Sequence, residues 1–160
     1  MKYWWLLLHP LMRLSLFFLL MTLVLAGCRD EKAAVEEFNT RPLKLPDGTT
    51  IRVEVMMDQK DVMRGMMFRD SLPEGRGMVF VHARPLKLSY WMYQVKVPLD
   101  IAWLNANKQI VEVSENTPPC KTKASECPTY GGKEDSSYAL ELPGGYGRKH
   151  GVQVGNVVSF

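Results

Sequence analysis

The chain has 160 residues, which is enough for one domain with a single hydrophobic core, and no repeat or low-complexity tract divides it. Its formal net charge is +3, from 20 Lys and Arg against 17 Asp and Glu. Because the basic residues form no cluster or stripe, the charge pattern argues against a nucleic-acid partner.

The first segment, residues 1–27, has the pattern of an export signal. Arg13 precedes an apolar run at 14–25, and small residues follow that run. This order is typical of signal peptides, and the run is shorter than the ~20 apolar residues that a bilayer span needs. Leu25-Ala26-Gly27-Cys28 resembles the lipobox of bacterial lipoproteins, which implies cleavage before Cys28 and acylation of its sulfur. The alternative is an uncleaved N-terminal helix anchor.

The residues before Arg13 leave two starts of translation open. Residues 1–11 are apolar but contain Pro10, which would break a continuous helix. Met12 followed by Arg13 would open a more ordinary signal peptide, so the start is either Met1 or Met12. Loss of Lys2 and Arg13 with the signal would leave 18 basic against 17 acidic residues, a near-neutral protein.

Residues 28–42 are polar and contain few residues that could form a core. We predict that they tether the lipid on Cys28 to a domain at 43–160. Two or more acyl chains would hold such a protein firmly on a membrane. Residue 29 is Arg rather than Asp. By resemblance to lipoprotein sorting in two-membrane bacteria, this is compatible with the outer membrane. The expected location is the cell envelope, with the domain facing the periplasm or the exterior.

The domain begins with a predicted hairpin and a short helix. Residues 43–45, turn residues at 46–49 and an alternating strand at 51–57 together indicate the hairpin. At 58–68 the alternation gives way to apolar residues at helical spacing. Gly65 would end this helix after about two turns. It is the one helix that we expect in the domain.

The aromatic and β-branched block at 90–113 predicts the centre of a sheet. A short strand at 78–81 and a turn at 82–87 lead into it. Pro98 and turn residues at 105–108 divide the block. The resulting extended runs lie at 91–95, 99–104 and 110–113.

The last part of the chain combines a long irregular stretch at 114–137 with an alternating strand at 138–142. Glycines at 144–147 indicate a tight connection, and apolar runs at 152–154 and 157–160 close the chain. Short strands divided by turns are typical of sandwiches and barrels. We therefore expect a mainly β fold, a single compact sandwich or barrel with one short helix.

Trp91-Met92 followed by Pro98-Leu99-Asp100 resembles the core signature of the family known as domain of unknown function 192. Further pieces of the family pattern follow one another along the chain, at 64–69, 77–81, 118–130, 139–141 and 151–155. The resemblance runs from about residue 43 to residue 160. It implies a compact all-β sandwich with jelly-roll-like topology, and no agreed activity comes with it.

Cys120 and Cys127 are the cysteines that remain once Cys28 is lipidated. Because an exported protein meets an oxidising environment, we predict a disulfide between them. The alternative is a redox pair or a metal site. However, the spacing is not Cys-x-x-Cys and no second Cys/His pair stands nearby. We expect no metal and no cofactor.

Seven methionines fall between Met56 and Met92. Their spacing fits the inner face of one strand and one helix, where Met fills gaps in a core. Soft thioethers also bind Cu(I), and His82 or His150 could assist. A metal-handling protein is therefore one alternative function.

Asp100 and Glu141 are the carboxylates that interrupt the predicted strands. If both faced one cleft, they could act as acid and base in a hydrolase, with Arg64 beside them. The structural alternative is partly buried ion pairs, in which Arg64 or Arg69 satisfies these carboxylates.

A ligand-binding cleft would use the same residues differently. Trp91 and Tyr93 would supply an apolar or sugar-stacking wall, and Arg64 and Arg69 would bind an anionic group. No nucleophile elbow, phosphate loop, zinc-protease helix or dinucleotide fingerprint is found in the sequence. We therefore favour a membrane-anchored lipoprotein that binds an envelope small molecule or polymer, or that has an accessory role. The sequence indicates no particular protein partner.

Overall fold

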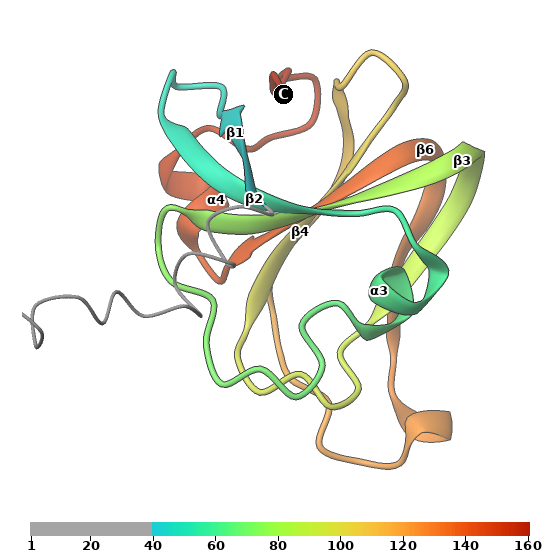
Figure 1. Ribbon diagram of the computed structural model, residues 1–160. Helices are drawn as coiled ribbons and strands as arrows, with labels where there is room; N and C mark the ends of the chain where they lie inside the picture. The colour runs from blue at the N-terminus through green and yellow to red at the C-terminus, as the bar shows by residue number, and fades with distance from the viewer. Residues whose placement is uncertain (1–39) are drawn as a thin grey trace, which may run out of the picture. The chain divides into compact units, whose positions relative to one another are not determined.

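The computed structural model describes residues 40–160, in which six strands form one mixed sheet in the order β1-β2-β3-β6-β4-β5 (Figure 1). The strands are β1 Thr40–Lys44, β2 Thr50–Met56, β3 Arg76–Trp91, β4 Leu99–Leu104, β5 Ile110–Thr117 and β6 Thr129–Pro143. The mainly β prediction is confirmed. The sheet is open and does not close into a barrel, because β1 and β5 form its two edges.

The predicted signal peptide at 1–27 and the lipidation of Cys28 lie outside the described residues, as do both start codons. The predicted tether at 28–42 also lies mostly outside them. Its last residues are an exception, because β1 begins at Thr40 and pairs with β2 from there. The sheet therefore starts before residue 43. Within residues 40–160, no helix is long and apolar enough to cross a membrane.

The hairpin and the helix near the start of the domain are confirmed. β1 and β2 pair antiparallel, with Leu43 opposite Ile51. β2 and β3 pair parallel, and such a pair needs a crossover connection. The connection contains α3, Gln59–Arg64, which ends at Gly65 with a φ of 43°. This geometry favours glycine, as the sequence predicted.

Both faces of the sheet are covered by apolar side chains. We call the first face the side that carries Val79, Ala102 and Leu140, and the second face the side that carries Phe80, Trp103 and Ala139. All six residues of β4 are buried as a result. Strands that are covered on both faces read as near-continuous apolar runs rather than as strict alternation.

β3 and β6 form the longest pairing, from Met78 opposite Glu141 to Trp91 opposite Thr129. Register shifts interrupt the pairing between Val81 and Leu86 and again between Lys87 and Ser89. Such irregularities bend a strand pair. The two strands run side by side and curve together in Figure 1.

Three sequence predictions are corrected by these strands. Residues 82–87 were expected as a turn but belong to β3. Residues 114–117 and 129–137 were expected as irregular but belong to β5 and β6. The run at 91–95 is not a strand. β3 ends at Trp91, Tyr93 forms one isolated bridge to Cys120, and Gln94 has a φ of 58°.

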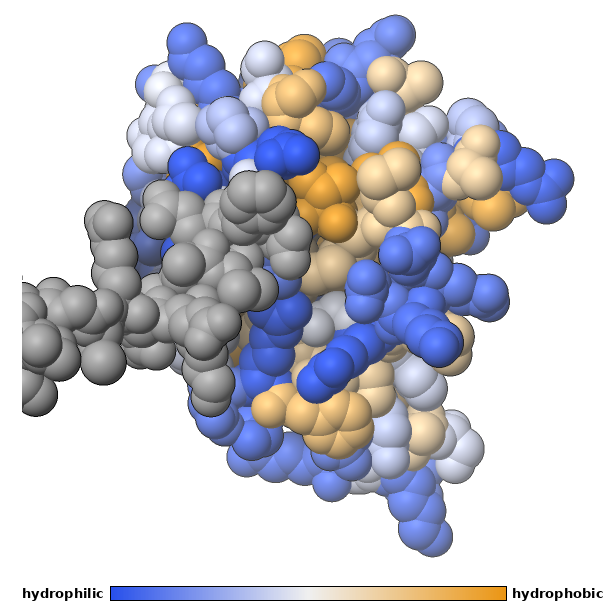
Figure 2. Space-filling view, viewed as in Figure 1, coloured by the Kyte–Doolittle hydropathy of each residue, from blue (hydrophilic) through white to orange (hydrophobic). Residues whose placement is uncertain are grey.

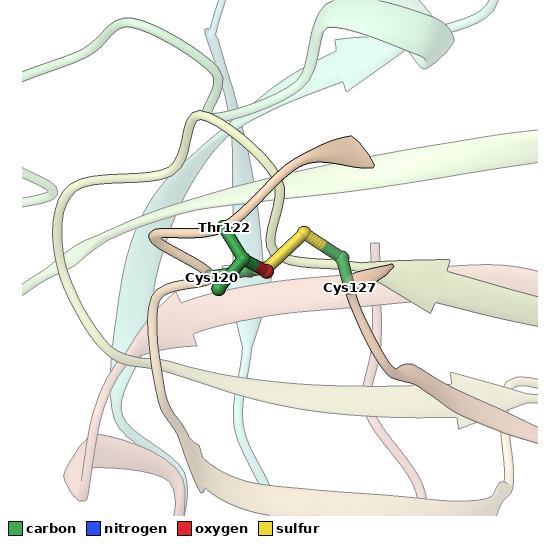
Figure 3. Close-up of a disulfide and its surroundings, with 3 residues drawn as sticks. All are labelled: Cys120, Thr122 and Cys127. Atoms are coloured by element: carbon green, nitrogen blue, oxygen red, sulfur yellow. A yellow bond between two sulfur atoms is a disulfide. The ribbon is translucent and has the colours of Figure 1, made fainter. Parts of the chain in front are cut away.

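The predicted disulfide is present between Cys120 and Cys127, whose Cα atoms lie 5.7 Å apart. Figure 3 shows it joining the two ends of the loop, with Thr122 beside Cys120. A short 3-10 turn, Ala124–Glu126, lies between the two cysteines. The backbone N–H of Cys120 donates to the carbonyl of Met92 over 3.0 Å. The bridge therefore fixes the loop against the segment that follows β3.

The end of the chain contains a second short helix, α4, Tyr146–Lys149, where only a glycine turn was predicted. Gly145 precedes it in the left-handed conformation, with a φ of 79°. The final run then pairs back through isolated bridges from Ser159 to Lys44 and from Val157 to Gln109. The last residues therefore return to the sheet, but through single bridges rather than as a strand, and Val154 and Val157 are exposed.

Gly131 and Gly132 offer a matched test of the packing around Trp103. Both have a φ near 80°, at +82° and +81°. A Cβ on Gly131 would lie 2.3 Å from the Trp103 ring, whereas a Cβ on Gly132 meets nothing closer than 3.5 Å. Gly131→Ala should therefore lose about 1–3 kcal/mol of unfolding free energy beyond the loss of Gly132→Ala. Urea unfolding of the two variants measures this, and equal losses would contradict the packing described here.

Candidate functional site

A pocket of about 220 Å³ lies between α3 and the second face of the sheet. Its wall from α3 and the turn that follows includes Val62, Arg64 and Met66. Its wall from β3 and β6 consists mainly of Phe80, His82, Tyr90, Trp91 and Glu141. Most of the lining is therefore apolar or aromatic, which is typical of small-molecule sites.

Glu141 lies at the centre of the sheet, on β6 between Met78 of β3 and Ile101 of β4. Only 6% of the residue is exposed, and its Oε2 atom has no hydrogen-bond partner within residues 40–160. Burial raises the pKa of Glu141 to about 8, and the positive charge of Arg69 opposes this rise. Burial disfavours the charged form of a carboxyl group, so Glu141 is mainly protonated at neutral pH.

Tyr90 and His82 form a hydrogen-bonded pair on the same wall. His82 Nε2 lies 2.9 Å from the Tyr90 hydroxyl. Edge-to-face contacts with Phe80 and Trp103, at centroid distances of 5.4 and 5.9 Å, fix the Tyr90 ring. Burial lowers the pKa of His82, which favours the neutral imidazole. Burial, and the negative charge that Glu141 carries once it is ionised, both raise the pKa of Tyr90, so the phenol keeps its proton.

Gly65 allows the end of α3 to approach Glu141 closely. A Cβ at this position would lie 3.1 Å from the Phe80 ring and 3.9 Å from Glu141 Oε2. A larger residue would therefore press on the floor of the pocket. The glycine thus serves both the helix end and the shape of the site.

The mouth of the pocket combines apolar side chains with one cation. Met63 and Trp91 are 70% and 43% exposed, and Arg64 is also exposed. Figure 2 shows one face of the molecule, on which apolar residues lie among hydrophilic ones. Exposed apolar side chains that border a pocket are typical of binding sites.

The structure brings together three of the predicted ligand-binding residues, Arg64, Trp91 and Glu141. Arg69 lies outside the lining and forms a two-pronged ion pair with Glu54, at 2.6 and 2.8 Å. Tyr93 does not line the pocket but packs on the ring of Trp91, with a centroid distance of 5.4 Å.

Asp100 points to the first face, away from the pocket. It is opposite Leu142 on β6, whereas Glu141 is opposite Ile101, so the two carboxylates project from opposite faces of the sheet. The predicted acid–base pair of a hydrolase is therefore not formed.

The side chain of Asp100 has a different role, because it accepts three backbone hydrogen bonds. The N–H groups of Asn116, Gly145 and Gly147 donate to it over 2.6, 2.9 and 2.7 Å. These contacts join the ends of β5 and β6 to the start of α4. Asp100 is therefore a structural residue.

Four of the seven methionines, Met56, Met66, Met78 and Met92, are buried in the core on the second face, as packing predicted. Met66 also lines the pocket, together with Met63, Met67 and His82. Among residues 40–160, no group of three or more His, Cys, Asp or Glu side chains is placed to hold a metal ion. The nitrogen of His82 that faces Tyr90 is already hydrogen-bonded.

Sequence reasoning did not select His82 for the pocket, apart from its mention as a metal ligand, and did not select Tyr90. The alternation of Leu88, Tyr90 and Met92 was the available signal for Tyr90, because these residues share a core cluster on the second face. His82 lies within the register shift between Val81 and Leu86, and no local pattern marks it.

The chain forms a small, mainly β domain. Its open mixed sheet and α3 enclose a pocket that is lined by the carboxyl group of Glu141. The sequence profile of the DUF192 family, described as "Uncharacterized ACR", matches residues 43–160. The chain belongs to this family. None of the curated proteins compared with the chain matches it.

The solved structures that resemble this one include the following two. A protein of unknown function from Novosphingobium aromaticivorans DSM 12444 has a TM-score of 0.68 and 22% identity, over 76% of this chain and 85% of its own. A protein of Sinorhizobium meliloti 1021, whose name proposes a transcription regulator, has a TM-score of 0.64 and 26% identity, over 74% of this chain and 89% of its own. They support the fold.

Proposed function

We propose that this protein is a lipid-anchored lipoprotein of the cell envelope that binds a small, largely apolar molecule in the pocket between α3 and the second face. The observation that carries the proposal is Glu141, a buried residue that lines the apolar pocket and whose Oε2 atom has no hydrogen-bond partner among residues 40–160. The role is binding or accessory rather than hydrolytic, because Asp100 does not share this face.

An unpartnered buried polar atom is costly to the fold. Leaving it without a hydrogen bond loses about 1–3 kcal/mol, and buried side-chain polar atoms are partnered in most proteins. An apolar residue of similar size would avoid this loss. A ligand that hydrogen-bonds to Glu141 would recover it, so the feature favours a binding site over a purely structural core.

The size of the pocket limits the ligand. A volume of about 220 Å³ corresponds to roughly seven water molecules at ~30 Å³ each. This is below the usual range for drug-sized ligands. The pocket would hold a small molecule, or one terminal group of an envelope polymer.

A thermal-shift screen of the protein, expressed from its full sequence, tests the binding role. Small apolar molecules, envelope sugars, short peptides and metal ions form the panel, and a ligand at a hundred times its Kd should add about 2.7 kcal/mol to stability. Val62→Trp should fill the pocket and abolish the shift. Lys60→Trp, on the same helix but outside the lining, should retain it. No shift with any class, or the same shift in both variants, would remove the proposal.

The anchoring role rests on the sequence pattern of residues 13–28 and is supported by the Cys120–Cys127 disulfide, which suits an oxidising compartment. Mass spectrometry of the N-terminal peptide should find acyl chains on Cys28. Cys28→Ser should release the protein from the membrane fraction. A full-length chain in the cytosol, with residue 28 unmodified and the other two thiols reduced, would contradict it.

A further inference from the structure

The ionisable groups around the pocket divide into a neutral interior and a charged rim. Glu141 on β6 and the His82–Tyr90 pair on β3 lie inside, and burial favours the neutral form of each. Arg64 is exposed at the mouth. β4 presents only the apolar side chains of Leu99, Ile101 and Trp103 to this face.

Two other charged groups lie close by but outside the lining. Arg69 follows α3 and pairs with Glu54 of β2, so its charge is matched there. Its positive charge still acts on Glu141. The buried end of the pocket therefore carries no formal charge at neutral pH, and the charges near it are those of Arg64 and of the Arg69–Glu54 ion pair.

This arrangement disfavours charged ligands at the buried end. An ammonium group would have to ionise Glu141 in an apolar environment and would lie near Arg64 and Arg69. A carboxylate would lose its hydration without an ion-pairing partner inside, because Arg64 lies at the rim. An uncharged ligand avoids both losses.

A protonated carboxyl group has one O–H donor, and a donor needs an acceptor. Carbonyl oxygens are strong acceptors that carry no charge. The aromatic rings of Phe80 and Trp91 on the same wall offer contact to an apolar body.

We propose that the pocket selects uncharged molecules with a carbonyl group at the buried end, to which the Glu141 carboxyl donates a hydrogen bond, and with an apolar body that packs on Phe80 and Trp91. The inference rests on the proposed binding function and names the chemical class of the ligand. Tyr90, hydrogen-bonded to His82, lines the same wall.

Four probes of similar size test this selection. Acetophenone carries a carbonyl group, ethylbenzene is a hydrocarbon, benzylammonium is a cation and benzoate is an anion. Calorimetric titration of the protein at pH 6 should show acetophenone binding about tenfold more tightly than ethylbenzene, the worth of one net hydrogen bond. Both ions should bind more weakly than ethylbenzene. Raising the pH to 9 should weaken acetophenone binding about tenfold, because Glu141 then ionises.

Two variants assign the effect to Glu141. Glu141→Gln keeps an N–H donor and should bind acetophenone with no pH dependence over this range. Glu141→Leu should lose the preference for acetophenone while it retains ethylbenzene binding. Urea unfolding of each variant establishes that it folds.

The outcomes distinguish this inference from the proposed function. Equal binding of ethylbenzene and acetophenone would overturn the carbonyl selection and leave a simple apolar pocket. Tightest binding of benzylammonium, with release of a proton, would also overturn it and indicate a cation site. If none of the four probes binds, and the compounds of the thermal-shift screen shift Val62→Trp and the unaltered protein equally, both proposals fail.

Discussion

Glu141→Gln should stabilise the protein, by an amount that grows with pH. The pKa of Glu141 is about 8 in the folded protein and 4.5 in the reference state. Between these values the folded form holds one more proton than the unfolded form, so stability falls as the pH rises, by about 1.4 kcal/mol per pH unit. Below pH 4.5 nothing is lost, and above pH 8 the loss is complete. Gln does not titrate, so the variant does not lose this stability as the pH rises.

The expected gain is small at pH 5, about 3 kcal/mol at pH 7 and about 5 kcal/mol at pH 9. Urea unfolding at the three pH values measures it. Glu112→Gln is the matched control, because Glu112 is also a buried strand glutamate, but it accepts the backbone N–H of Lys133 over 3.0 Å. The control should show no gain. Parallel stability curves for Glu141→Gln and the unaltered protein would mean that Glu141 is ionised in the fold.

The elements that the sequence predicted well are those with a local pattern. The hairpin at 43–57, the helix before Gly65 and the strand at 99–104 each depend on neighbouring residues and on turn chemistry. β3 beyond residue 81 and β6 before residue 138 are different. They are held mainly by each other, over a large sequence separation and across register shifts. No local pattern marks such a pairing, so these stretches were predicted as turn and loop.

The site was predicted in part for a related reason. Arg64, Trp91 and Glu141 were selected by residue type, and the fold brings them together. The pairing of Asp100 with Glu141 failed because β4 and the end of β6 are buried on both faces. Alternation then no longer indicates which face a side chain occupies. Only the register, with Asp100 opposite Leu142, places the two carboxylates on opposite sides.

Asp100 and Glu141 are both buried, but stability measurements can distinguish their roles. Asp100 is 2% exposed and Glu141 is 6% exposed, so burial alone does not separate them. Asp100 accepts three backbone N–H bonds, whereas Glu141 Oε2 accepts none within the described part of the chain. Hydrogen bonds stabilise a carboxylate, and burial without them destabilises it. Replacing the carboxyl group by an amide should therefore lower the free energy of unfolding at Asp100 and raise it at Glu141.

Asp100→Asn should lower the free energy of unfolding by about 4 kcal/mol or more. Each hydrogen bond to a charged group contributes about 1.5–3 kcal/mol, and the amide nitrogen of Asn is a donor that would face backbone donors. At least one buried N–H, from Asn116, Gly145 or Gly147, would then lack an acceptor. The ends of β5 and β6 and the start of α4 would lose their common anchor.

Asp47→Asn is the control for this prediction. Asp47 also accepts a backbone N–H, from Thr49 over 2.9 Å, and binds His150, but it is exposed. Its loss should be much smaller than that of Asp100→Asn, since exposed ion pairs contribute little. Urea unfolding at pH 7 compares Asp100→Asn, Asp47→Asn and Glu141→Gln directly. A small loss at Asp100, equal to that at Asp47, would mean that the three N–H groups find other acceptors. A large loss at Asp100 beside a gain at Glu141 would show that the first carboxyl group stabilises the fold and that the second destabilises it.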